Sequence, residues 1–173
     1  MTSKTSRPLP LLLAAVALIT LGGATHVRAQ SSGPSAMGGS IIRDDFVEGR
    51  TTLSFTAVTQ ANNTVIGQAE YHFVRIDPFF PQEVRLHVEI NCLNIGPDGK
   101  TATLSGVVKN SNSEQAVGAT AIFRVRDNGE GGNAQPDGVT PVFLLAPDLN
   151  RNCNILTGIQ PTPITGGNVQ VKP

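Results

Sequence analysis

Tryptophan is absent from this chain, tyrosine occurs once, at Tyr71, and only His72 and His87 among its histidines lie beyond residue 29. Sugar-binding sites usually need aromatic platforms, and so few large rings are poorly suited to supply them. No Gly-x-Ser-x-Gly motif is present to place a nucleophile, and no carboxylates are visibly paired for glycoside hydrolysis. We therefore expect a protein that is not an enzyme and carries no cofactor.

Long apolar runs are also scarce, and the single one covers Pro8–Leu21. At about 14 residues it is shorter than the ~20 that a spanning helix needs. Basic residues precede it, and Val27-Arg28-Ala29 follows it in the pattern that a signal peptidase reads. This pattern predicts a signal peptide over residues 1–29, with cleavage after Ala24 or a retained anchor as alternatives. We expect a secreted or periplasmic protein, or one of the cell envelope, with no membrane span after removal of the signal.

The part that would remain has no large excess of charge of one sign. Removing the three basic residues of the signal leaves ten Lys and Arg against 13 Asp and Glu, a slightly acidic balance. No basic patch is left to attract nucleic acid or anionic lipid. The partner that we expect is therefore a protein or another component of the envelope, and not a nucleic acid.

Cysteine occurs only at Cys92 and Cys153. In an oxidising compartment an even number of cysteines predicts a disulfide, and two cysteines allow one pairing within the chain. Such a bridge closes a loop of about 60 residues, which the chain-entropy model values at roughly 4 kcal/mol. The alternative, a redox-active or metal-binding thiol pair, lacks the usual Cys-x-x-Cys spacing.

Residues 41–173 show the two-residue alternation of β-strands, and no amphipathic helix is evident. Residues 30–40 are small, polar and glycine-rich, which predicts a disordered leader. The clearest strand is Val84–Leu93, with Val84, Leu86, Val88, Ile90 and Cys92 expected on one face. Further strands are expected at 51–58, 67–76, 101–108, 116–126, 139–145 and 168–172, with Pro141 marking an edge or a bulge. Together they predict a single all-β domain, an antiparallel barrel or sandwich of about 7–8 strands.

Three segments occur together in a recognisable order: INCLNIGPDGKTATLSGVV (90–108), FRVRDNGEGG (123–132) and PITGGNVQV (163–171). In this order they resemble a group of bacterial exported all-β proteins of unknown function. That group has an Asp-Asn-Gly-Glu turn and a C-terminal Gly-Gly-Asn-hydrophobic-x-Val strand. The chain departs from the pattern at Gly131-Gly132, where the group usually has Pro-Gly. The resemblance implies a small exported barrel or sandwich, and it implies no activity.

Asp127, Glu130 and Asp137 are one candidate binding site. Carboxylates around a glycine-rich turn can bind calcium, although the EF-hand spacing is not met because Gly129 and Gly131 stand where ligands would be needed. The alternative is an ordinary turn, since Asp and Asn readily cap their own backbone.

A second candidate site depends on strand register. If residues 67–76 and 84–93 form a hairpin centred between Phe79 and Phe80, His72 faces His87 and Glu70 faces Glu89. Two imidazoles and two carboxylates on one face could bind Zn²⁺ or another divalent ion. The alternative is a solvated face, and a slip in register would separate these side chains.

Phe79 and Phe80 lie between two prolines at the predicted hairpin tip. They form either an exposed apolar contact or a cap folded onto the barrel. We predict an exported structural or interaction module, and the alternative is a barrel that binds a small ligand or a divalent metal.

Overall fold

The computed structural model describes residues 33–44, 49–75, 82–131, 134–147, 153–156 and 158–173. The predicted signal peptide and the predicted tip at Phe79 and Phe80 lie outside these residues. The described chain contains one short 3₁₀ turn, η1 (Glu114–Ala116), and ten strands. The strands are β1 (Ser35–Asp44), β2 (Gly49–Thr59), β3 (Val65–Arg75), β4 (Gln82–Ile95), β5 (Thr101–Ser111), β6 (Thr120–Arg126), β7 (Gly138–Val139), β8 (Phe143–Leu145), β9 (Thr162–Pro163) and β10 (Gly166–Lys172).

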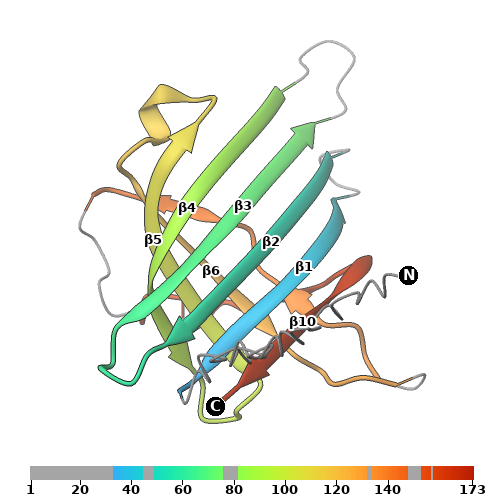
Figure 1. The fold of residues 1–173 in the computed structure, drawn as a ribbon. Helices are drawn as coiled ribbons and strands as arrows, with labels where there is room; N and C mark the ends of the chain where they lie inside the picture. The colour runs from blue at the N-terminus through green and yellow to red at the C-terminus, as the bar shows by residue number, and fades with distance from the viewer. Residues whose placement is uncertain (1–32, 45–48, 76–81, 132–133, 148–152, 157) are drawn as a thin grey trace, which may run out of the picture.

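The strands form one antiparallel sheet in the order β10-β1-β2-β3-β4-β5-β6-β7-β9, with β8 paired to β6. Long neighbouring strands are joined in sequence from β1 to β6, and the sheet curls into a half-barrel (Figure 1). The prediction of an all-β antiparallel architecture is confirmed. The strand number is higher than predicted, partly because the chain leaves the sheet around Pro141 and so divides one expected strand into β7 and β8. Among the described residues, no helix is both long and apolar enough to span a bilayer.

The predicted disordered leader is wrong for residues 35–40, which belong to β1 and pair with both β2 and β10. One of the glycines that suggested disorder, Gly38, is instead required by close packing. A Cβ atom at Gly38 would lie 2.5 Å from the backbone oxygen of Asn168 and 3.2 Å from the ring of Phe55. The ordered domain therefore begins earlier than the predicted residue 41.

The main core fills the inner face of the curled sheet. The predicted inward residues Leu53, Phe55 and Ala57 of β2 are all buried, as are Leu86, Val88 and Ile90 of β4. Phe55 meets Phe123 of β6 edge to face, with ring centroids 5.5 Å apart. Contact between rings from β2 and β6 shows that side chains join distant strands across the interior.

A second region of close packing lies between β4 and β5. A Cβ atom at Gly106 would lie 2.1 Å from the backbone oxygen of Glu89 and 2.7 Å from the Cα of Ile90. We expect Gly106→Ala to lower the free energy of unfolding by about 3 kcal/mol, because the backbone would have to move to admit a methyl group. Urea unfolding measures this change. Gly39→Ala is the matched control, since a Cβ there meets nothing within 4 Å, and equal urea midpoints for the two variants would contradict the prediction.

A β-bulge in β4 changes the direction of Cys92. The register with β5 shifts between Ile90 and Cys92, so that Ile90 pairs with Gly106 and Cys92 pairs with Ser105. An extra residue in one strand reverses the alternation beyond it. Cys92, which we predicted on the inner face with Val88 and Ile90, therefore lies on the outer face.

The outer face at β4–β6 is covered by residues 153–156 and 158–159. Cys92 and Cys153 form a disulfide with their Cα atoms 6.0 Å apart, as predicted, and the Ser105 hydroxyl lies 3.3 Å from Cys153 Sγ. Arg124 Nη1 donates hydrogen bonds to the backbone oxygens of Leu156 and Ile159 at 2.8 and 2.7 Å. Beneath this layer Thr103, Ser105 and Ile122 are buried. A disulfide of this kind is compatible with an oxidising compartment such as the cell exterior.

Candidate functional site

The outer face of β2, β3 and β4 carries polar side chains. Alternation places Thr52 and Ser54 of β2 outward, while Leu53 between them points into the core. Strands β3 and β4 continue the same alternation. We define the polar face as the outward side chains of Thr52, Ser54, Gln68, Glu70, His72, Glu83, Arg85 and His87.

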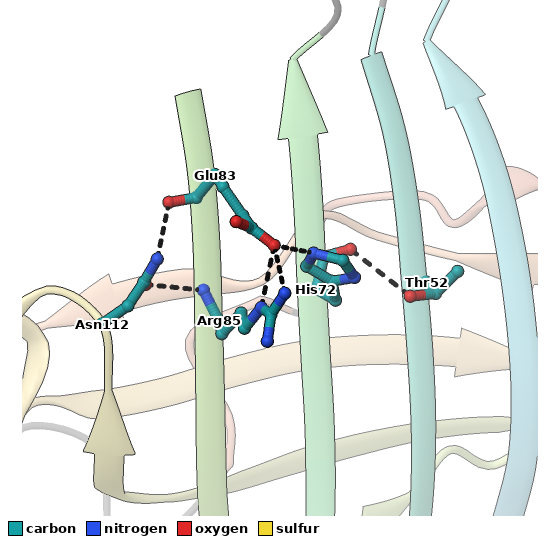
Figure 2. A network of polar contacts seen from close by, with 5 residues as sticks. All are labelled: Thr52, His72, Glu83, Arg85 and Asn112. Carbon is teal, nitrogen blue, oxygen red and sulfur yellow. Dashed lines mark hydrogen bonds and ion pairs between the residues drawn. The ribbon is translucent and has the colours of Figure 1, made fainter. Parts of the chain in front are cut away.

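Glu83 organises one end of the polar face. Its Oε1 atom is 2.6 Å from His72 Nε2 and 2.6 Å from Arg85 Nη2 (Figure 2). Hydrogen bonds from Arg85 and then from His72 hold the pKa of Glu83 below its ordinary value. Glu83 therefore remains charged around neutral pH and keeps both basic side chains in place.

Asn112 joins this network to the end of β5. Its Oδ1 atom accepts a hydrogen bond from the backbone N–H of Arg85 at 2.8 Å, and its Nδ2 atom donates to the backbone oxygen of Glu83 at 2.9 Å (Figure 2). One side chain thus satisfies two polar backbone groups at the edge of β4 beyond the last paired residue of β5, Ser111.

The predicted hairpin of β3 and β4 exists, but its register differs from the prediction by two residues. Glu70 pairs with His87, and His72 pairs with Arg85. The predicted oppositions of His72 with His87 and of Glu70 with Glu89 are therefore wrong. The prediction assumed a turn centred between Phe79 and Phe80, and the sequence alone did not fix the register.

The corrected register converts the predicted four-ligand cluster into separate ion pairs. His87 Nδ1 binds Glu70 Oε1. Glu89 is bound instead by Lys109, whose Nζ lies 3.0 Å from Glu89 Oε2. In the parts of the chain that the structure describes, no three His, Cys, Asp or Glu side chains are arranged to share a metal ion.

Two adjoining hollows lie on the polar face, over β10, β1, β2 and β3, and one of them reaches Arg85 of β4. One has a volume of about 430 Å³ and lies between Met37, Gln68 and Gln170. The other has a volume of about 660 Å³ and extends from Gly39 and Ile41 towards His72 and Arg85. Both hollows are lined by Ser54 and Glu70, and we call the two hollows together the trough.

The predicted calcium candidates contact β10 instead of surrounding an ion. Asp137 is buried, and its two carboxylate oxygens accept hydrogen bonds from the backbone N–H groups of Asn128, at 2.9 Å, and Val169, at 2.7 Å. Asp127 Oδ2 accepts a hydrogen bond from the backbone N–H of Val171 at 3.0 Å. These are the N–H groups of β10 on the side opposite β1, so the two carboxylates take the place of a neighbouring strand.

The rest of this loop is held in the same way. Asp127 Oδ1 accepts a hydrogen bond from the N–H of Gly129 at 2.8 Å, and Glu130 Oε1 accepts one from Gln170 Nε2 at 3.2 Å. All four carboxylate oxygens of Asp127 and Asp137 thus receive backbone donors. This arrangement fits the turn interpretation, extended by a structural role for both aspartates in joining the ends of the half-barrel.

Sequence reasoning missed Glu83, Arg85 and Gly39. The alternation of Glu83, Arg85, His87 and Glu89 along β4 was a usable signal, because neighbouring charges of opposite sign on one face form pairs. Gly39 was hidden in the segment predicted as disordered. Comparisons with known protein families, with curated proteins and with solved structures found no match to this chain, so the proposals that follow rest on its own residues.

Proposed function

We propose that this chain is an exported, non-catalytic interaction module of the cell exterior, and that it contacts its partner through the polar face. Export is supported by the N-terminal sequence pattern and by the compatibility of the Cys92–Cys153 disulfide with an oxidising compartment. Large side chains such as Phe123 and Ile90 are fully buried in the core. This packed interior favours a binding site on the outside of the sheet.

The proposal rests on the difference between the outer face at β4–β6 and the outer face at β2–β4. At β4–β6 that face is covered by the chain's own later residues and joined to them by the disulfide. At β2–β4 the polar side chains remain exposed, yet they are held in place by ion pairs around Glu83 and between Glu70 and His87. Exposed side chains that are already ordered lose less conformational entropy when a partner binds.

The test is binding of the fluorescently labelled protein to envelopes isolated from the cells that produce it. We expect saturable binding that Ser54→Arg weakens at least tenfold, because Ser54 is an exposed residue of the polar face and lines both hollows. Gln115→Arg is the matched control, since it adds the same side chain at an exposed position in η1. Absence of saturable binding, or equal loss in both variants, would count against the proposal.

A further inference from the structure

We propose that the trough binds an extended, uncharged peptide segment of the partner protein. This inference rests on the proposed function, because it names the partner chemistry at the same face. The groups that would hold the peptide are the side-chain amides of Gln68, Asn168 and Gln170, which all line the trough.

The trough owes its space to Gly39. An ideal Cβ atom at this position would meet no atom within 4 Å, and the residue is exposed. Gly39 lies opposite Ser54 of β2 and Asn168 of β10 in the sheet. The trough follows β1 from Met37 to Ile41, a distance of about 13 Å at the usual rise of an extended chain. This length accommodates about four residues of an extended peptide.

The polar groups of the trough match a peptide backbone. A side-chain amide offers both a donor and an acceptor, as does each peptide unit, so the two can pair through two hydrogen bonds. Gln68 and Asn168 are exposed, and Gln170 is fixed by its hydrogen bond to Glu130. Met37 is 37% exposed at one end of the trough, and it offers an apolar contact for a side chain of the peptide.

The charged side chains at the trough favour an uncharged peptide over a charged one. The carboxylate of Glu70 is paired with His87, and the guanidinium of Arg85 is paired with Glu83. The titratable side chains that line the trough, Glu70, His72 and Arg85, therefore each already have a side-chain partner. A charged ligand would have to compete with these partners and would gain little from such exposed pairs.

Two other binding modes fit the trough less well. Phe55 and Tyr71, the aromatic residues beside it, sit among the inward residues of the sheet and offer no outward ring on which a sugar could stack. Strands β1, β2 and β3 are each paired on both sides, so a peptide cannot be added to their edges as a further strand. Side-chain recognition of an extended peptide on the outer face remains the mode that these residues favour.

The experiment begins with selection of a displayed library of random hexapeptides against the immobilised protein. Enriched peptides are then synthesised with capped ends and titrated into the ¹⁵N-labelled protein, with maltohexaose and polyglutamate in parallel. We expect uncharged peptides to shift the amide signals of residues 37–41, 52–56 and 68–72 and to saturate. Gly39→Val should weaken this binding at least tenfold without unfolding the protein, because a valine side chain fills open space and suits a strand.

Gly158→Val is the matched control, because it fills open space at an exposed glycine that does not line the trough. Enriched peptides that shift signals elsewhere, equal affinity of the Gly39→Val variant and the wild type, or saturation by maltohexaose or polyglutamate in place of the peptides would each overturn the inference. If envelope binding is lost in Ser54→Arg while no peptide binds the trough, the proposed function stands and only the peptide is refuted. Failure of envelope binding itself refutes the proposed function.

Discussion

Replacing Asp137 by asparagine is expected to lower the free energy of unfolding by about 4 kcal/mol. The carboxylate of Asp137 is buried and accepts hydrogen bonds from the N–H groups of Asn128 and Val169. Hydrogen bonds to a charged group contribute roughly 1.5–3 kcal/mol each. Asparagine has almost the same shape, but its amide nitrogen would face one of these donors and leave a buried N–H without an acceptor.

Urea unfolding of the wild type and Asp137→Asn measures this effect, and hydrogen exchange locates it. The amides of Val169 and Val171 should exchange faster in the variant, because β10 loses part of its attachment on the side opposite β1. Glu130→Gln is the matched control, since Glu130 is exposed and its contact to Gln170 is made between side chains. We expect that control to remain within about 0.5 kcal/mol of the wild type. An unchanged midpoint for Asp137→Asn would show that the carboxylate does not hold β10.

The second large effect is expected from replacing both Cys92 and Cys153 by serine. The two residues are separated by 61 positions in the sequence, and loss of a loop of about this size corresponds to roughly 4 kcal/mol in the chain-entropy model. The covering segment also loses its covalent attachment to β4. The buried side chains beneath it, including Ile122, should therefore become accessible before the main core unfolds.

Denaturant unfolding of the double-serine variant checks the magnitude. Mass spectrometry after alkylation under denaturing, non-reducing conditions checks the premise, since the wild type should show no free thiol. Hydrogen exchange then separates the two layers: amides of β6 near Ile122 should lose protection, while amides of β2 near Phe55 should keep it. Equal stability of the wild type and the double-serine variant, or uniform loss of protection, would contradict this account.

Local alternation predicted the main features of the sheet. Leu53, Phe55 and Ala57 are apolar residues at a spacing of two, and each is buried as that spacing requires. The turn at residues 96–99 was equally predictable. Asp98 Oδ1 accepts hydrogen bonds from the backbone N–H groups of Lys100 and Thr101, and Gly99 has a φ of 65°. These features depend on neighbours in the sequence, so the sequence alone is enough to reveal them.

The candidate site was less predictable because it depends on contacts between distant residues. The sequence alone did not fix the register of β3 and β4, and an error of two residues separated the predicted ligands while keeping them on the correct face. Asp127 and Asp137 suggested calcium because their partners, the N–H groups of β10, lie more than 30 positions away. Ile122 did give a clue, since an apolar residue on a polar face predicts that something covers it.

The bulge at Asn91 changes which residues of β4 point towards the core. Before it, every even-numbered residue from Val84 to Ile90 points inward, and after it Leu93 and Ile95 take that role. If Asn91 were instead paired in a regular strand, simple alternation would direct Cys92 into the core and the two later apolar residues towards the outside. Ile90 and Cys92, which are two positions apart and would share a face in a regular strand, therefore lie on opposite sides of the sheet, and the position of the disulfide depends on the bulge.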